Sequence, residues 1–388
     1  MPRRRHEDSM SQARALIWVQ HLLGIGHLRR AVLLARTLAE NDFDVVLVSG
    51  GMPLQGLNPG KAKFKQLPPL RATDATFSAM VDANGHEPDG AFRALRRDRL
   101  LGLYREHRPQ VVITEMYPFG RRQFAAELLP LLEVAHRSRP KPAIIASVRD
   151  ILTERRDSAR SAEMASLALR WYRAVLVHGD PELIPFEASF PETERISHLI
   201  RYTGYIGAVG PGGPYGASGE VIVSAGGGAV GAHLLQTAME ARDLSVLADR
   251  RWRLLAGSNL PREWFNALTR LAPDGTVVER ARDDFPELLE AAALSISQAG
   301  YNTVLDVVSA RVRSVLVPFA AKGETEQAVR AACMAKAGLA QIVREDALTP
   351  ERLAAAVDAA WAAPAPELKI GVAGAGESAR IISETVSA

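Results

Sequence analysis

The chain has 388 residues, more than one ordinary hydrophobic core accommodates, so two domains are expected. Its composition, 47% hydrophobic and 23% charged, is typical of a soluble globular protein and excludes an intrinsically disordered chain. The net charge of +3 is too small for a dedicated nucleic-acid-binding protein, although a mild basic excess suits an acidic ligand or an anionic membrane surface.

Cysteine usage and the apolar runs indicate the compartment. The single cysteine, Cys333, excludes an internal disulfide and fits a reducing cytoplasm. No apolar run reaches the roughly 18 residues that a membrane span needs. The basic start, MPRRRHEDSM, is followed by an apolar stretch that Gln20 and His21 interrupt, and no cleavage site follows. We therefore expect a frayed terminus rather than a signal peptide, and a cytoplasmic protein.

Short apolar runs alternate with helical patterns along most of the chain, as in parallel sheets whose strands are buried on both faces. In the first half, strands are predicted at 15–19, 44–49, 110–114, 143–147 and 174–178, with helices such as 28–40 and 124–136 between them. After the Gly- and Pro-rich segment 205–220, strands are predicted at 220–225, 251–257, 276–281, 293–297 and 314–319.

This pattern predicts an α/β protein with two parallel-sheet domains joined by a flexible linker. The expected boundaries are an N-terminal domain over 12–206, a linker over 207–218, a C-terminal domain over 219–375 and a tail helix over 376–388. Ligands of such sheets bind beyond the carboxyl ends of the strands, so a cleft between the two domains is the expected site.

The first motif is VQHLLGIGHLRR (19–30), a strand followed by a glycine turn and a helix. Gly24 and Gly26 permit a tight turn, and the helix that begins near His27 offers free N–H groups to an anion. His27 is suited to accept a proton from a hydroxyl or from water. A dinucleotide fingerprint is excluded because Arg29 occupies its third glycine position and no acidic residue ends the second strand. A capping histidine without chemistry stays an alternative.

Two charged segments follow the first motif. Asp42-x-Asp44 precedes its strand, so a turn is favoured over a metal site, and no His/Cys cluster has metal-ligand spacing. The run FRALRRDRLLGLYREHR (92–108) is a basic amphipathic helix. It would suit an anionic membrane surface, although a solvated helix face is the more common role of such a run.

Charged residues also follow two predicted strands of the first half, and strand ends lie near the expected cleft. EMYPFGRRQF (115–124) contributes Glu115 and Arg121, and SVRD (147–150) contributes Arg149 and Asp150. Arginine side chains suit phosphate or carboxylate groups. Solvated charges at helix starts are the alternative.

The second half holds three further motifs. SAGGGAVGAHLL (224–235) is a strand, a glycine turn and a helix, so it predicts a second anion site. SISQAGYNTVLDVVSA (295–310) ends a strand and starts a helix on which Asp306 lies one turn beyond Asn302. A carboxylate there could accept both hydroxyls of a ribose. In VPFAAKGETEQAVRAACMAKAG (317–338), Gln327 opens a helix and could bind sugar hydroxyls, or else face solvent.

Together these motifs resemble MurG-type glycosyltransferases, and most closely a group known as predicted glycosyltransferases. The matching residues are the pattern S-x-A-G-x-x-T-V-x-[DE] around Gly300, then V-P-F and a glutamine near the next helix start. The G-x-G-H-x-x-R loop resembles the acceptor-domain loop of the same superfamily. The resemblance implies the GT-B fold, with two Rossmann-like domains facing a cleft.

The resemblance also implies roles for individual residues. Asp306 would hold the donor ribose, Gln327 would contact the donor sugar, and His27 would lie near the acceptor. The donor pyrophosphate would be bound by Gly226, Gly227 and Gly228 and by the turn with Gln298, Gly300, Asn302 and Thr303. The family usually has Glu in place of Asp306 and a Gln pair in place of Glu326-Gln327, which leaves the donor sugar open.

We therefore expect a glycosyltransferase that moves a hexose-type sugar from a nucleotide-diphosphate donor, most simply a UDP-sugar, without a cofactor or metal ion. His27 is the expected general base, with Glu115 and Asp150 as other candidates, and Gly24, Gly26, Arg29, Arg121 and Arg149 on the acceptor side. The family implies inversion at the anomeric carbon. The acceptor is not identified; a lipid-linked or polysaccharide precursor of the cell envelope, with peripheral contact at the inner membrane face and no nucleic acid, is expected.

Two alternatives stay open. The G-x-G-H-x-x-R loop also resembles enzymes that hydrolyse UDP-sugars, in which His27 would activate water. A nucleotide-sugar-binding protein without activity is the other alternative.

Overall fold

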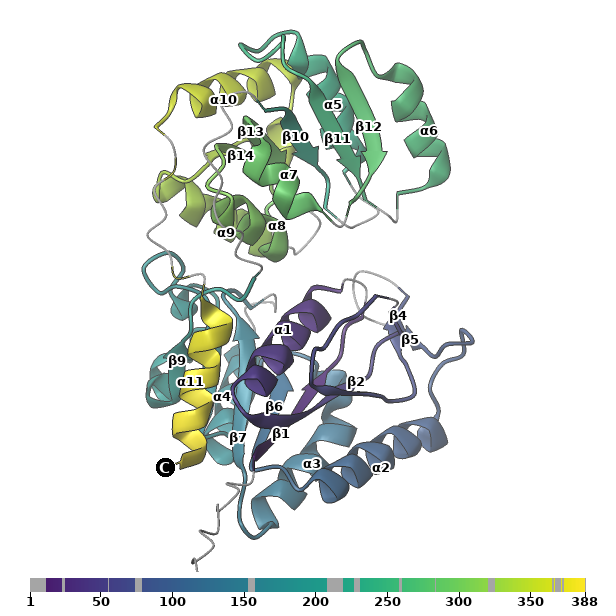
Figure 1. The fold of residues 1–388 in the computed structure, drawn as a ribbon, viewed down its shortest axis with the longest axis vertical. Coiled ribbons are helices and arrows are strands. Elements are labelled where there is room, and N and C mark those ends of the chain that lie inside the picture. The colour runs from purple at the N-terminus through teal and green to yellow at the C-terminus, as the bar shows by residue number, and fades with distance from the viewer. Residues whose placement is uncertain are drawn as a thin grey trace, which may run out of the picture.

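The computed structural model describes most of the chain (Figure 1). The described residues are 12–22, 25–54, 56–73, 79–152, 158–207, 219–226, 231–257, 260–282, 284–319, 325–364, 366, 371 and 373–387. The predicted site residues Gly24, Gly227 and Gly228, and most of the predicted linker, lie outside this range.

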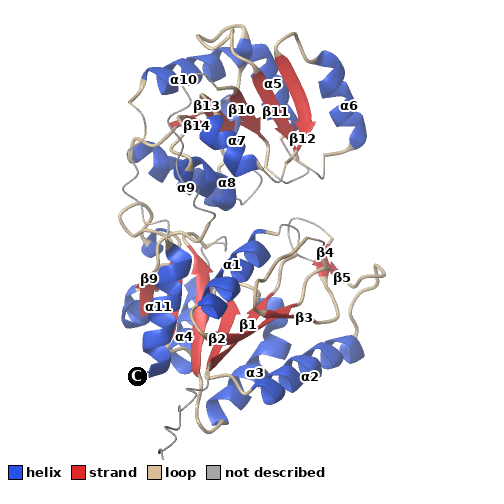
Figure 2. Cartoon of the chain, in the orientation of Figure 1, coloured by secondary structure: helices blue, strands red, loops and turns tan. Residues whose placement is uncertain are grey.

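The N-terminal domain is built on a parallel sheet in the strand order β3-β2-β1-β6-β7-β8-β9 (Figure 2). Its strands are β1 (Ala13–Val19), β2 (Phe43–Ser49), β3 (Lys63–Gln66), β6 (Val111–Glu115), β7 (Ala143–Arg149), β8 (Ala174–His178) and β9 (Ile200–Tyr202). Strands β1, β2, β6, β7 and β8 are buried almost throughout, which explains their continuous apolar sequences. A small antiparallel pair, β4 (Arg71–Ala72) and β5 (Met80–Val81), lies beside the sheet.

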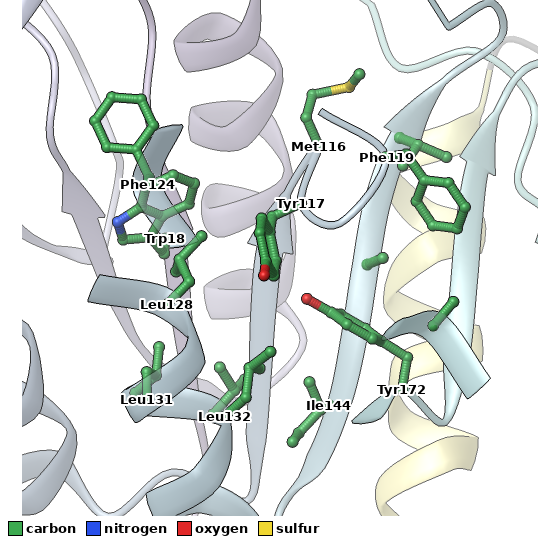
Figure 3. Packing of buried hydrophobic residues seen from close by; sticks show 14 of the residues in the cluster. Trp18, Met116, Tyr117, Phe119, Phe124, Leu128, Leu131, Leu132, Ile144 and Tyr172 are labelled. Atoms are coloured by element: carbon green, nitrogen blue, oxygen red, sulfur yellow. The ribbon is translucent and has the colours of Figure 1, made fainter. Parts of the chain in front are cut away.

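Helices cover both faces of this sheet. They are α1 (Gly26–Glu40), α2 (Gly90–His107), α3 (Ala125–Arg137) and α4 (Ser158–Trp171), with 3-10 turns η1 (Arg122–Phe124), η2 (Phe186–Ala188) and η3 (Glu194–Leu199). One core cluster lies under α2, α3 and α4, where Trp18 packs edge-on against Phe124, with ring centroids 5.8 Å apart (Figure 3). A second cluster lies under α1 on the other face.

The C-terminal domain repeats the arrangement with a second parallel sheet, in the order β12-β11-β10-β13-β14-β15. Its strands are β10 (Val221–Ser224), β11 (Trp252–Ala256), β12 (Thr276–Arg280), β13 (Leu294–Ser297), β14 (Ser314–Leu316) and β15 (Gln341–Ile342). Its helices are α5 (Ala232–Arg242), α6 (Arg262–Leu271), α7 (Phe285–Ala291), α8 (Tyr301–Ser309), α9 (Glu326–Lys336) and α10 (Pro350–Ala362), with the 3-10 turn η4 (Glu345–Ala347).

The two parallel sheets confirm the predicted fold class. Each apolar run of the sequence forms a strand within two or three residues of the predicted bounds. The pattern missed the short strands β3, β4, β5, β9 and β15, because they are not buried throughout and lack the continuous apolar run that marked the equally short β10, β13 and β14.

The last helix, α11 (Gly374–Ser387), returns to the N-terminal domain and lies against α1 (Figure 1). Ala379, Ile381 and Ile382 are buried there in the cluster under α1. The chain therefore passes between the domains twice, once after β9 and once before α11. These two passages lie side by side, because Tyr205 N–H donates to Gly371 O at 2.8 Å and Gly374 N–H donates to Tyr205 O at 3.0 Å.

Candidate functional site

The beginning of α1 and the end of β6 bring two predicted site residues together. Strands β1 and β6 are parallel neighbours, with Trp18 opposite Thr114, so the turn after β1 and Glu115 lie at the same edge of the sheet. His27 lies in the first turn of α1, and its Nδ1 is 3.0 Å from Oε1 of Glu115. The imidazole is 16% exposed, whereas the carboxylate is 2% exposed. The structure thus forms a histidine–carboxylate pair from residues 88 positions apart.

The partners of Glu115 determine which ring nitrogen of His27 carries the proton. Arg30 donates to Oε1 of Glu115 and also lies with Nη2 3.2 Å from Nδ1 of His27. An ionised carboxylate only accepts hydrogen bonds, so at 3.0 Å the Nδ1 of His27 must be the donor. The Arg30 guanidinium is then satisfied by Glu115 rather than by the ring. Nε2 of His27 is left with its lone pair, as a proton acceptor.

Burial and charge keep this pair in a neutral-imidazole, ionised-carboxylate state. Burial and the Arg121 guanidinium lower the pKa of His27 to about 3, and the Glu115 carboxylate offsets this only in part. Burial alone would raise the pKa of Glu115, but the charge of Arg30 and the hydrogen bonds from His27 and Ser147 hold it below its usual range. His27 is therefore unprotonated at neutral pH.

A buried hydrogen-bonded chain continues behind Glu115. Ser147 Oγ donates to Oε2 of Glu115 at 2.5 Å and lies 2.9 Å from Nε2 of His178, at the end of β8. Nδ1 of His178 lies 2.9 Å from Oγ1 of Thr203. Burial lowers the pKa of His178 to about 3, with Arg30 contributing. Sequence analysis missed Ser147, His178 and Thr203; a polar residue at the end of an apolar strand was the available signal for His178.

Cations surround this centre on the acceptor side. Arg121 has a left-handed backbone, with φ at 62°, and its Nε donates to Gln20 O at 2.7 Å at the end of β1. Burial and the charge of Arg149 lower the pKa of Arg121 to about 10. Arg149 Nη1 lies 2.8 Å from Oε1 of Glu326 in the other domain. Of the predicted acceptor-side arginines, Arg121 therefore lies near His27, Arg149 lies near Arg121 and pairs across the domain junction, and Arg29 acts on Asp306 instead.

The predicted donor residues lie at the start of α8. Gly300 precedes the helix with an extended backbone, and a Cβ there would meet no atom within 4 Å, so the turn is open to a ligand. Asn302 is exposed, and Thr303 and Asp306 are partly exposed on the same helix. Burial and Glu287 raise the pKa of Asp306 to about 7, against the opposing charge of Arg29.

The other predicted donor residues take more structural positions. Gly226 has φ at +67°, which favours glycine, and the buried Gln298 lies 3.8 Å from where its Cβ would be. Oε1 of Gln327 accepts hydrogen bonds from the backbone N–H groups of Ala299 and Phe319, both at 3.0 Å. Gln327 therefore fixes the turn before α8 through its side-chain oxygen.

The two sides of the site touch. A Cβ at Gly26 would lie 2.5 Å from Nδ2 of Asn302, so the α1 turn and the α8 turn are packed directly against each other. Asp150 is fully buried, and both of its oxygens accept from Arg330 of α9, at 2.9 and 3.1 Å. Arg330 also donates to Glu326 at 2.8 Å. Asp150 thus lies in an interdomain ion pair, and both of its carboxylate oxygens are occupied by Arg330.

A metal site and a membrane-spanning helix each have requirements that the described residues do not meet. No group of three His, Cys, Asp or Glu side chains there could hold a metal ion. Asp42 lies in a left-handed turn, and Asp44 pairs with Lys63 at 2.8 Å. Of the helices in the described part of the chain, none is long and apolar enough to cross a membrane. The apolar side of α2 packs into the domain core, and its Arg96 is buried against Glu127.

Comparisons with known proteins agree with this geometry. Residues 225–369 match the model of the glycosyltransferase family 28 C-terminal domain. The UDP-N-acetylglucosamine--N-acetylmuramyl-(pentapeptide) pyrophosphoryl-undecaprenol N-acetylglucosamine transferase of Brucella anthropi is 33% identical over 142 residues, which are 36% of this chain and 38% of that protein. The transferase of the same name from Phenylobacterium zucineum is 30% identical over 151 residues, 38% of this chain and 41% of that protein.

Solved structures cover the whole fold. MurG of Acinetobacter baumannii aligns with a TM-score of 0.58 at 16% identity, over 96% of this chain and 99% of that chain. The glycotransferase of kitacinnamycin aligns with a TM-score of 0.66 at 16% identity, over 97% and 99%. The chain spans about two fifths of the length of the two curated relatives named above. Residues 225–369 thus match the glycosyltransferase family 28 C-terminal domain, within a chain of GT-B fold that resembles the MurG-type glycosyltransferases.

Proposed function

We propose that the protein is a glycosyltransferase that moves a hexose-type sugar from a nucleotide-diphosphate donor to an acceptor hydroxyl, with His27 as the general base. The observation that carries the proposal is the His27–Glu115 pair, 3.0 Å between Nδ1 and Oε1, packed against a family 28 donor domain. A base oriented by a carboxylate has a fixed tautomer and presents one lone pair to the acceptor.

The transfer step follows from this arrangement. Nε2 of His27 accepts the proton of the acceptor hydroxyl as that oxygen attacks the anomeric carbon of the donor sugar. The bond from this carbon to the nucleotide diphosphate breaks, and its electrons leave with the diphosphate. Attack from the face opposite the leaving group inverts the anomeric configuration. The imidazolium formed is stabilised by the ionised Glu115 carboxylate, which stays unprotonated.

The donor would bind at the turn before α8. Its N–H groups at the helix start favour the negative charge of the diphosphate, so we propose that the leaving group is stabilised without a metal ion. Gly300 leaves room for the phosphates, and Asp306 would accept the ribose hydroxyls. The names of the curated relatives specify UDP-N-acetylglucosamine, and we propose a UDP-sugar for this chain.

The acceptor would enter beside Arg121 and Arg149, whose guanidinium groups suit an anionic precursor. A lipid-linked acceptor, as in the names of the relatives, would place the protein at the inner membrane face. Because the apolar side of α2 is buried, its contact with a membrane would be made by exposed arginines rather than by insertion.

The test is a donor screen. Binding of UDP, dTDP and GDP is measured by calorimetry, and UDP-hexoses are then incubated with and without candidate polyprenyl-diphosphate or oligosaccharide acceptors. We expect UDP to bind and His27→Asn to bind UDP as the wild type does while losing transfer. Binding of none of the nucleotides would contradict the proposal. Rapid release of free sugar without an acceptor, abolished by His27→Asn, would replace it with UDP-sugar hydrolysis.

A further inference from the structure

Tyr301 occupies a position at the domain junction that the proposed reaction does not use. It is the first residue of α8, directly before the exposed Asn302, and its side chain points away from solvent, with 8% of the residue exposed. The hydroxyl donates to the backbone oxygen of His178, at the end of β8 in the N-terminal domain, at 3.1 Å. A residue of the donor domain is therefore inserted into the acceptor domain.

Two guanidinium groups lie against the ring of Tyr301. The Arg30 guanidinium carbon is 5.2 Å from the ring centroid, and that of Arg330 is 5.6 Å away. These are cation–π distances, and such contacts are strongest where water is excluded. Arg30 is 3% exposed and Arg330 is 1% exposed. The ring of Tyr301, in the C-terminal domain, thus covers the guanidinium of Arg30, in the N-terminal domain.

Arg30 is the residue through which Tyr301 reaches the base. Arg30 donates to the same oxygen of Glu115 that accepts from His27, so any movement of Arg30 changes the environment of that oxygen. If Arg30 moved away, its charge would no longer oppose protonation of His27, and water would enter beside Glu115. Both changes raise the pKa of His27, because each one removes a cause that keeps it low.

The charged and titratable groups that face His27 and Arg30 come from every element packed around them. They are Glu115 on β6, Arg121 after β6, Asp150 after β7, His178 on β8 and Tyr301 on α8. Of these, only Tyr301 belongs to the donor domain. Among the charged and titratable side chains of the described residues, Tyr301 is therefore the one through which the donor domain reaches Arg30, beside the contact of Asn302 with Gly26.

We propose that Tyr301 is a positioning residue, which holds Arg30 on Glu115 and so makes His27 a neutral, correctly oriented base only while the two domains are docked. The catalytic role of Tyr301 rests on the proposed function, but what the proposal predicts is the protonation state and tautomer of His27, which can be measured without turnover. Because α8 also carries the predicted donor residues, docking of the donor turn and assembly of the base are one event.

The test measures His27 directly rather than through turnover. Protein labelled with ¹⁵N in its imidazole rings gives histidine tautomers and titration curves by NMR, and His27→Asn identifies the His27 signals by their loss. In the wild type, we expect His27 to stay neutral with the proton on Nδ1 from pH 8 down to pH 5. In Tyr301→Leu, we expect His27 to titrate within that range, with its midpoint shifted upward toward the ordinary value of about 6.5.

Two variants separate the ring of Tyr301 from its surroundings. Tyr301→Phe keeps the ring over Arg30 and loses the bond to His178, so it should titrate as the wild type does. Leu305→Ala is the matched control for lost apolar packing on α8: Leu305 lies one turn along α8, shares a buried cluster with Tyr205 and Tyr301 and covers Gly207, and the variant keeps the Tyr301 ring over Arg30. It should leave the His27 titration unchanged. If Leu305→Ala shifted His27 as much as Tyr301→Leu does, the specific role of Tyr301 would be overturned.

Arg30→Lys completes a double-mutant cycle and covers the case in which Tyr301→Leu does not fold. The lysine keeps the charge but cannot lie flat on the ring, so this variant alone should shift the His27 titration upward. In its background, Tyr301→Leu should add little further shift. Full additivity, or an unchanged His27 in both single variants, would refute the inference. Failure of the proposed function would appear elsewhere, as absent nucleotide binding with the His27 titrations behaving as described.

Turnover supplies a second reading once a donor and an acceptor are known. Tyr301→Leu should lower kcat by about tenfold, less than the roughly 100-fold or more expected for loss of the base itself. The acidic limb of its pH–rate profile should move to higher pH along with the NMR titration. A lower kcat with an unmoved acidic limb would indicate a merely structural residue.

Discussion

The two domains share one architecture but differ in the burial of the polar groups at the carboxyl edges of their sheets. At the carboxyl edge of the N-terminal sheet, Glu115, Ser147 and His178 are buried and bonded to one another. At the corresponding edge of the C-terminal sheet, the turn with Gly300 is open, and Asn302 is exposed. The polar side chains of the first edge are thus fixed by one another, whereas the second edge stays accessible.

This difference matches where the chain resembles known proteins. The family model covers 225–369, the side on which we propose that backbone N–H groups and glycines bind the nucleotide. The N-terminal side, outside that match, holds the arginines and histidines that we propose for the acceptor side. A donor site made of backbone geometry is easily recognised between proteins, whereas an acceptor site made of side-chain contacts is specific to each one.

The largest expected effect is a loss of turnover from a change in the N-terminal domain alone. His27→Ala should lower turnover by about 10²–10⁴-fold, the usual contribution of a general base, and leave UDP affinity nearly intact. Because the pKa of His27 is lowered to about 3, the wild-type rate should stay level as pH falls from 7 to 5. Steady-state kinetics across this range measure both. An active His27→Ala would contradict the assignment of His27 as the base, and an acidic limb near the ordinary histidine value would contradict its lowered pKa.

The second prediction concerns the ion pair between Arg330 and Asp150 at the junction of the two domains. Arg330→Met leaves the buried Asp150 carboxylate without its partner, so the free energy of unfolding should fall by about 3–5 kcal/mol. Urea denaturation followed by circular dichroism measures it. Asp150→Ala in the same chain should restore part of the loss. The control, Arg344→Met, removes an exposed pair with Asp346 and should change little. An equal loss in both arginine variants would refute the role of burial.

The third prediction tests the C-terminal side alone. Asp306→Ala should weaken UDP binding by about 1.5–3 kcal/mol, the range for hydrogen bonds to a charged group. The pKa of Asp306 is raised to about 7, and ribose hydroxyls donate best to the ionised form. UDP affinity of the wild type should therefore fall as pH drops below 7. Asp306→Asn should remove that dependence in calorimetric titrations; an affinity that is independent of pH in the wild type would exclude this carboxylate.

The smallest expected effect is the change in the free energy of unfolding with pH that two buried histidines of the N-terminal domain cause. The pKa values of His27 and His178 are both lowered to about 3, so the unfolded chain binds more protons than the folded one between pH 6.5 and 4.5. Stability should therefore fall with falling pH, by about 1.4 kcal/mol per unit for each histidine. His178→Gln should reduce that slope, and His86→Gln, at an exposed position, should not. Equal slopes in urea titrations of all three proteins would contradict the prediction.

Local sequence patterns predicted much of the fold and some of the residues that come together at the candidate site. Apolar runs identified the main strands because parallel strands are buried on both faces, and the strand-end position of Glu115 anticipated its place beside His27. The partners of these residues were not predictable. Asp150 and Arg330 lie 180 residues apart in different domains, and Tyr301 had the sequence context of an ordinary helix start. Such contacts depend on how the two domains dock, and local sequence periodicity carries no information about that.

The double passage of the chain between the domains has a mechanical consequence. A single linker would be a tether and would let one domain swing, twist and shift sideways against the other. Here the segment at Tyr205 is bonded to the segment at Gly371 and Gly374, and α11 anchors the second segment on α1. Two bonded segments restrict twisting and sliding of one domain against the other more than a single linker would. Under the proposed function, this restriction would bring α8 and its bound donor back to His27 in the same orientation after each turnover.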